Sequence, residues 1–173
     1  MSAVDNNPSN KNFLSPLNFT FQIKKAPHVN FFIQKVNLPA ISLRSVETSN
    51  PFIKIPYAGD HLDFGELKIS FKVDEDFQNY LEIHNWLRAL GKPEDFAQYK
   101  AISDIPSYTG DGIVSDISII VLSSAKVANY DISYVDAFPV SLSDINFSTT
   151  DNDVNYIEAS ASFKYTYYNI TKI

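Results

Sequence analysis

The chain contains no cysteine among its 173 residues, and it has only one methionine and one tryptophan. The missing cysteines exclude a disulfide framework, a thiolate metal site and a cysteine nucleophile. A protein that needs no disulfide also suits assembly in a reducing cytoplasm. A chain of this length is sufficient for one domain whose packed core, rather than covalent cross-links, provides its stability.

Long apolar runs are missing as well. No apolar stretch approaches the ~20 residues that a membrane-spanning helix needs. The first twelve residues, MSAVDNNPSNKN, lack the basic region and the apolar segment of a signal peptide. We therefore expect no membrane insertion.

Positive charge is scarce in the second half of the chain. Residues 1–100 hold eleven basic and eleven acidic side chains, whereas residues 101–173 hold three lysines against nine acids. Residues 127–163 contain no Lys or Arg. Tight binding of phosphate groups depends on clustered cations, so this acidic half argues against it. A charge run of this kind is most often a solvated surface.

The polar residues form no recognisable catalytic or metal-binding pattern. The three histidines, His28, His61 and His84, stand far apart and lack the spacing of a zinc site. The D-x-D-x-N sequence at 151–155 copies the start of a calcium loop but lacks its glycine and its closing glutamate. The S-x-x-K match at 123–126 has no K-T-G partner. We therefore expect no enzymatic activity, no metal and no cofactor.

A strand followed by a helix is the clearest local pattern. Residues 67–73 alternate between apolar and polar, which indicates a strand with one buried face. Asp74 suits a helix N-cap and Gly91 suits the residue after the last turn. The apolar spacing predicts a helix over about 75–90. The side of this helix predicted to face the core carries Phe77, Tyr80, Leu81, His84, Leu87 and Leu90.

The rest of the chain reads as strands, which suits its 13 Phe and 10 Tyr. Residues 17–24 and 29–36 are predicted to form a hairpin, and 42–55 is a weaker alternating pair followed by a turn at 57–60. Further strands are predicted at 117–122, 130–142, 145–148 and 156–168. We expect a mainly β fold with one helix packed across it.

The chain is predicted to be one domain with two irregular segments. Residues 1–16, rich in Asn, Ser and Pro, predict a flexible N-terminal arm, and residues 17–173 form a single β domain with a long loop at about 92–116. A lone domain has little use for two such segments. We therefore expect the arm, the loop and one of the weaker strands around 42–55 to contact neighbouring subunits.

The order of these elements resembles that of a known family. The matching pieces are the 19–39 stretch closed by Leu-Pro, the 67–90 stretch in which a strand, an acidic turn and Trp86 come together, and the terminal strands within 136–168. Together they resemble the tail tube proteins of contractile-tailed bacteriophages and their relatives at the baseplate. The resemblance covers half to two-thirds of the chain.

The resemblance implies a β-sandwich or barrel with a flanking helix, and a structural rather than enzymatic role. It further implies hexameric rings, stacked into a hollow tube inside a contractile sheath that joins a baseplate. DNA would pass through the lumen at ejection without adhering. The protein would belong to the virion tail and would be assembled in the cytoplasm of the bacterial host.

For such a tube, the acidic stretch at 127–163 is the candidate inner wall. The hypothesis is that carboxylates repel DNA weakly and keep it free to slide, whereas an outer-wall position would only maintain solubility. The candidate lumen residues are Asp151, Asp153, Glu158, Ser160 and Ser162.

Three alternatives remain open from the sequence. The chain can be a tube-initiating or baseplate copy of the same fold, or a tube protein of a contractile injection system. From a different class, it can be a small carbohydrate-binding or enzymatic β-domain with the loop at 92–116 as its lid.

Overall fold

The computed structural model of the protein describes residues 11–91, 97, 100, 112–149 and 156–173. Most of the predicted arm and of the predicted loop lies outside these residues, as do Asp151 and Asp153. The described part forms nine strands and two helices. In chain order they are β1 (Phe19–Ile23), α1 (Pro27–Phe32), β2 (Ile33–Val36), β3 (Ile41–Ser49), β4 (Lys54–Phe64), β5 (Leu67–Lys72), α2 (Gln78–Gly91), β6 (Ser115–Leu122), β7 (Ala128–Leu142), β8 (Glu158–Lys164) and β9 (Tyr167–Lys172).

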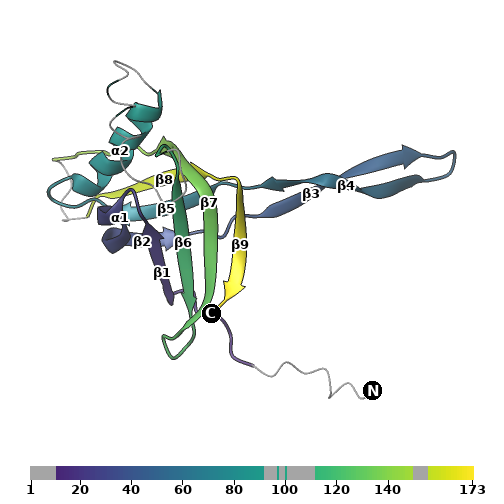
Figure 1. Ribbon diagram of the computed structural model, residues 1–173, viewed down its shortest axis with the longest axis horizontal. Coiled ribbons are helices and arrows are strands. Elements are labelled where there is room, and N and C mark those ends of the chain that lie inside the picture. The colour runs from purple at the N-terminus through teal and green to yellow at the C-terminus, as the bar shows by residue number, and fades with distance from the viewer. Residues whose placement is uncertain (1–10, 92–96, 98–99, 101–111, 150–155) are drawn as a thin grey trace.

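Seven of the strands form one antiparallel sheet that folds over at β7. The order is β1-β6-β7-β8-β5-β2, and β9 also pairs with β7. The first part of β7 pairs with β6 and β9, and the part from Phe138 onward pairs with β8. Asp136 has a positive φ of 56°, and the register shifts between Pro139 and Ser141. Bulges bend a strand, so β7 contributes to two layers, β1-β6-β7-β9 and β2-β5-β8-β7, which cross in Figure 1.

The core fills the space between these two layers, and α2 covers one end of it (Figure 1). Burial of apolar surface, at roughly 25 cal/mol per Å², is the main stabilising contribution. The prediction of a mainly β fold with a flanking helix is confirmed. The inward-facing residues with almost no exposure include Phe21, Ile23, Leu67, Ile69, Phe71, Ile117, Tyr134, Ala159, Ala161 and Phe163.

The predicted hairpin between residues 17–24 and 29–36 is wrong. In the described part β1 pairs with β6 and β2 pairs with β5, at opposite ends of the sheet. The segment between them is the helix α1, with Pro27 in its first turn, where the missing N–H and the fixed φ of proline suit a helix start. Val29 is fully buried on this helix.

The helix α2 begins later than predicted. Phe77 has a positive φ of 63° and precedes the first turn, so the acids of the 74–76 turn lie before the helix rather than in it. Asn79 holds this corner in place. Its Nδ2 donates to the Lys72 carbonyl at 2.7 Å, and its Oδ1 accepts from the Asp74 N–H at 3.4 Å.

The core-facing side of α2 is also rotated relative to the prediction. Of the predicted stripe, Tyr80, Leu87 and Leu90 pack against the core edge, Phe77 and His84 are half-buried, and Leu81 is exposed. The fully buried residues of the helix are Asn79, Ile83, Trp86 and Ala89. Both sides of the helix carry apolar residues, so the spacing of these residues alone does not determine which side faces the core. The structure selects the one on which Trp86 contacts Phe163, with ring centroids 6.1 Å apart.

Three smaller predictions about strands are also wrong. Residues 145–148 form no strand, and the predicted turn at 57–60 lies inside β4. The predicted strand at 156–168 is divided into β8 and β9, because the chain turns at Tyr165. There the aromatic rings of Tyr165 and Tyr168 pack against Tyr134, with centroid distances of 4.9 and 5.3 Å.

Candidate functional site

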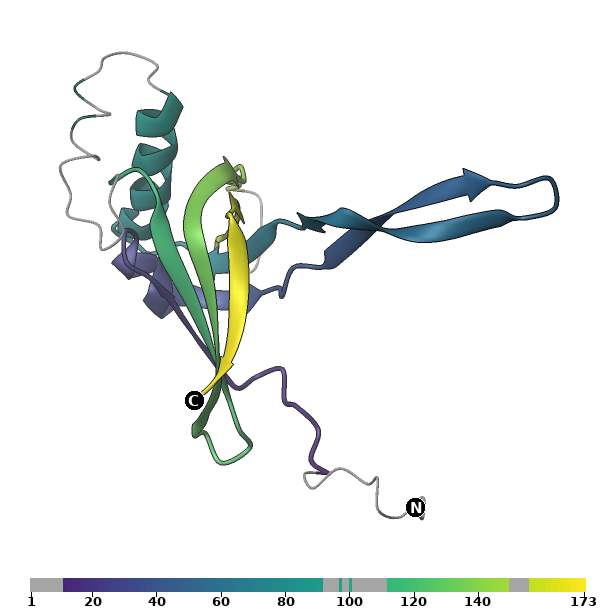
Figure 2. The same cartoon turned by 45° about the vertical axis from the view of Figure 1, so that its right-hand side comes forward.

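The most prominent feature of the surface is the hairpin formed by β3 and β4. It projects away from the sandwich as a long two-stranded ribbon (Figures 1 and 2). Its pairing runs from Ile41 opposite Phe64 to Ser49 opposite Lys54. At about 3.3 Å per residue, the eleven residues of β4 give the ribbon a length of roughly 35 Å. This length carries its tip far beyond the sandwich.

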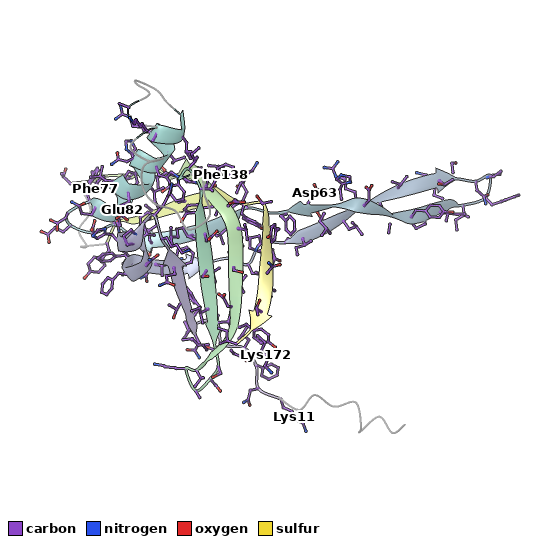
Figure 3. All side chains as sticks on the ribbon, in the orientation of Figure 1. Lys11, Asp63, Phe77, Glu82, Phe138 and Lys172 are labelled. Carbon is purple, nitrogen blue, oxygen red and sulfur yellow. The ribbon has the colours of Figure 1, made fainter. Side chains whose placement is uncertain are left out.

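One face of the hairpin is apolar although it is exposed: Leu43 pairs with Leu62 and Val46 with Tyr57, and such cross-strand partners share a face. Every residue of β3 is exposed, and Figure 3 shows side chains pointing to both sides of the ribbon. A two-stranded hairpin alone in water is marginally stable, and contiguous exposed apolar surface marks an interaction site. The hairpin therefore has the character of a contact surface. Its exposed apolar residues are Ile41, Leu43, Val46, Phe52, Ile53, Ile55, Tyr57 and Leu62.

Two ion pairs cross the ribbon without accounting for its stability. The Arg44 Nε lies 2.7 Å from Asp63 Oδ2, and the Lys54 Nζ lies 3.2 Å from Glu47 Oε2. The hydrogen bond from Arg44 lowers the pKa of Asp63. Exposed pairs of this kind contribute little to stability, because water and salt screen them. The apolar surface still lacks a partner among the described residues.

The base of the hairpin is fixed to the sandwich by an aromatic cluster. Phe64 packs against Tyr165 and Tyr168, with ring centroids 6.0 and 5.8 Å apart. The Tyr168 hydroxyl donates to the Pro39 carbonyl at 3.2 Å. Burial raises the pKa of Tyr165 to about 12 and raises that of Tyr134 as well, so both phenols stay neutral. The cluster sets the direction in which the ribbon projects.

The tip of the hairpin is a compact turn with two exposed apolar side chains. The Asn50 Oδ1 accepts from the Phe52 N–H at 2.9 Å, and the Asn50 N–H donates to the Ile53 carbonyl at 3.3 Å. Phe52 is 95% exposed and Ile53 is 64% exposed. Hydrogen bonds thus order the turn in a conformation that exposes both side chains.

The candidate lumen residues that the structure describes lie on β8, but they differ in exposure. Glu158 and Ser160 are exposed on the outer face of the β2-β5-β8-β7 layer. Ser162 is only 7% exposed, and its Oγ lies 2.6 Å from that of Ser141. Ser162 thus contributes little to any wall.

The strand register brings lysines to the same face as Glu158, which the sequence did not indicate. Directly opposed residues of antiparallel strands share a face. Lys72 lies opposite Glu158, and Lys68 lies opposite Ser162. Lys35 of β2 joins them opposite Ser70. The alternation within 67–72 predicts that the lysines are exposed, but only the register shows that they adjoin β8.

The histidines do not form a metal site. No group of three or more potential ligands lies together in the part of the chain that the structure describes. His28 contacts Glu82, with Nδ1 and Oε1 2.5 Å apart, and the Glu82 Oε2 accepts from the His28 N–H at 3.2 Å. This hydrogen bond raises the pKa of His28. The contact joins α1 to α2, beside the label of Glu82 in Figure 3.

A pocket opens at the end of the sandwich opposite α2. It has a volume of about 550 Å³ and lies between the ends of β1, β6, β7 and β9, the residues before β1 and the residues after β2. Its apolar lining includes Phe19, Val36, Val121, Ile132 and Ile170. We call it the mouth pocket. Among the described helices, none is long and apolar enough to cross a membrane.

The β-sandwich carries an exposed hairpin, anchored at its base by the aromatic cluster, and has an open apolar end. These are features of a structural subunit that assembles with other copies.

The comparison with known protein families supports the same class. The sequence model of the phage tail tube protein family matches residues 6–171, and the chain belongs to that family. The resemblance seen in the sequence is thereby confirmed. A structural role in a tail tube follows, and it weighs against the carbohydrate-binding or enzymatic alternative.

Solved structures have a similar fold. The tube-terminating cap of the anti-feeding prophage has a TM-score of 0.63 and 14% identity, over 100% of both chains. A chain of the sheath–tube complex of an extracellular contractile injection system, PVC, has a TM-score of 0.59 and 14% identity, over 100% of this chain and 99% of that one. No curated protein matches the sequence. At these identities the similarity shows a shared fold.

Proposed function

We propose that the chain is the repeating subunit of a phage tail tube, a hollow stack of hexameric rings through which DNA passes at ejection. The observation that carries this proposal is the projecting β3–β4 hairpin, whose apolar side chains are exposed in the isolated chain. Membership of the tail tube family supplies the context in which copies would cover it. A contact between unlike surfaces of identical subunits closes into a ring or continues as a stack.

The edges of the β2-β5-β8-β7 layer support ring formation. β2 is the last strand of the sheet order, and the part of β7 from Phe138 to Leu142 pairs with β8 on one side. Strands with an unpaired edge offer rows of N–H and C=O groups to another chain. Pairing between β2 of one copy and β7 of the next would join the layers of adjacent subunits into one continuous wall.

The outer face of this layer is the candidate lumen wall. We assign Glu158 and Ser160 to the wall, together with Asp151 and Asp153. The strand register adds three lysines to the same face: Lys35 of β2, and Lys68 and Lys72 of β5. A wall that mixes both signs binds the phosphate backbone less than a purely basic one, because fewer counterions are released. At physiological salt the remaining attraction is screened within about 8 Å. DNA would therefore slide rather than adhere.

The partners proposed for the tube are a contractile sheath and a baseplate. One similar structure is described as a sheath–tube complex, and another, with a TM-score of 0.59, as the baseplate of the anti-feeding prophage. By analogy the protein would be a component of the virion tail, assembled in the cytoplasm of the bacterial host. The tube of a contractile injection system is the second candidate, since the similar structures come from such systems.

Electron microscopy of the purified full-length protein tests the proposal. The expected particles are hollow tubes of stacked rings with sixfold symmetry. Single rings without stacking would instead favour the tube-initiating or baseplate alternative. Protein that remains monomeric at every concentration, or that forms filaments without a lumen, contradicts the proposal.

A charge substitution tests the wall. Glu158→Lys with Ser160→Lys should leave assembly intact but slow the release of DNA, more strongly at low salt. The matched control is Asn169→Lys with Thr171→Lys, two exposed residues on β9. If both double variants release DNA at the wild-type rate, the β8 face does not line the passage.

A further inference from the structure

The two ends of the sandwich differ in a way that the fold alone does not explain. At one end, α2 inserts Ile83 and Trp86 into the core. At the other end, the inward rows of β1, β6 and β9 finish in the open mouth pocket. Val121 and Phe19 on its wall are half-buried, and Ile170 is 55% exposed. A side chain from elsewhere would complete the core at this end.

Among the residues that the structure describes, those that approach the mouth pocket do not fill it. Phe13 and Leu14 line its edge but remain 98% and 71% exposed. The pocket volume of 550 Å³ falls within the ~300–1,000 Å³ typical of apolar sites that enclose a ligand. It thus has room for two large apolar side chains.

The hairpin tip has the matching chemistry. Phe52 and Ile53 are adjacent, exposed and held in an ordered turn by Asn50. Neither carries a charge that would have to be desolvated on entering the pocket. A preordered apolar turn also loses little conformational entropy on binding.

From this complementarity we infer that the hairpin tip of one copy inserts Phe52 and Ile53 into the mouth pocket of a second copy. The tip cannot reach its own pocket, because the ribbon runs away from the sandwich while the pocket lies at the end of β1, β6 and β9 (Figures 1 and 2). Each copy carries one tip and one pocket, so the contact repeats from copy to copy. The inference rests on the proposed assembly and specifies the contact within it.

Cysteine cross-linking provides the test, because the chain has no cysteine of its own. In the variant Ile53→Cys with Ile170→Cys, docking would bring the tip and the pocket wall within reach of a disulfide. Mild oxidation should produce a ladder of covalent dimers, trimers and longer chains. The ladder should form about 100-fold faster than in undocked protein, because docking holds the thiols at an effective concentration of roughly millimolar.

The matched control pairs the same tip with a different exposed site. Phe31 is 84% exposed on α1 and does not line the pocket, so Ile53→Cys with Phe31→Cys should give no ladder at this rate. As a second measurement, Phe52→Ser should raise the protein concentration needed for assembly at least tenfold, whereas Phe31→Ser should not.

The outcomes separate this inference from the proposed function. Tubes that form normally without the tip-to-pocket ladder overturn the inference and leave the tube function standing. Failure of the wild-type chain to assemble at all overturns both. A separate variant, Val4→Cys with Ile170→Cys, tests the N-terminal arm as the occupant. Rapid formation of an intramolecular disulfide in this variant, together with the lack of a ladder in the tip variant, would also overturn the inference.

Discussion

The strands β4 and β5 are consecutive in the chain, yet they have opposite environments. Only Gly65 and Glu66 separate the two strands, and the sequences of both strands alternate between apolar and polar residues. In β5, Leu67, Ile69 and Phe71 are almost completely buried between the layers. In β4 and its partner β3, equally apolar residues are exposed along the whole ribbon. Alternation therefore predicts a strand with one apolar face. It does not predict whether the core of the same molecule buries that face.

This difference divides the apolar residues into two energetic groups. Those of β5 contribute to the free energy of folding of the single chain, since they leave water when it folds. Under the proposed function, those of the hairpin leave water only when copies meet, so they would contribute to assembly. Substitutions in the two strands should consequently separate folding from assembly.

The largest expected effect is on β5. Phe71→Ala should lower the free energy of unfolding by about 3–5 kcal/mol, because it leaves a cavity beside Ala159 and Ile33. Leu62→Ala on β4, where the side chain is 55% exposed, should change it by less than about 0.5 kcal/mol. Urea denaturation of the monomer measures both. Equal decreases in the free energy of unfolding for the two variants would show that β4 and β5 contribute alike to folding, which contradicts the account.

An intermediate effect is expected at the corner between β5 and α2. Asn79→Ala should cost about 1–3 kcal/mol, because the Lys72 carbonyl loses a buried hydrogen-bond donor. Asn85→Ala, on the exposed side of the same helix, provides the control and should be nearly neutral. A neutral Asn79→Ala in thermal and urea denaturation would show that the corner does not depend on this amide.

The next variant sharpens the comparison by distorting only the hairpin. A Cβ on Gly59 would collide with the Arg44 carbonyl, beside the register shift between Leu43 and Ser45. Gly59→Val should leave the unfolding free energy of the sandwich within about 0.5 kcal/mol of wild type while it reduces assembly. Sedimentation velocity measures the assembly. Normal tubes from this variant would mean that the hairpin geometry is unimportant.

The smallest effect concerns pH and the contact between α1 and α2. The hydrogen bond and the charge of Glu82 raise the pKa of His28 above its ordinary value of 6.5. Stability from this pair is therefore fully present below about pH 6.5 and is lost as pH rises through the raised pKa. The urea midpoints of wild type and His28→Gln should differ at low pH and converge at high pH. A difference that stays constant with pH refutes the assignment.

The parts of the fold that could be predicted are those that local sequence determines. The β5 strand and the α2 helix follow from alternation, from helical spacing and from Gly91 near the end. The strands with which β1 and β2 pair could not be predicted. The apolar residues between 27 and 36 are compatible both with a short helix that starts at Pro27 and with an alternating strand. The choice of Ile83 and Trp86 as the buried side of α2 likewise depends on Phe163, which is distant in sequence.

The candidate site was predictable only in outline. The sequence predicts that one of the weaker strands around 42–55 contacts neighbours. The extension of the hairpin to Phe64 and its projection depend on the aromatic cluster around Tyr168. Residues 127–163 taken alone predict an acidic β8 face. Lys68 and Lys72 reach that face through strand pairing, which no local pattern encodes.

The central claim is that the hairpin serves assembly rather than folding. Hydrogen exchange of the backbone amides, measured in the monomer and in the assembled protein, tests it most directly. Amides of β3 and β4 should exchange fast in the monomer and at least ~10-fold more slowly after assembly, whereas those of β5 and β8 should be protected in both states. Exchange in the hairpin that is unchanged by assembly would contradict the claim.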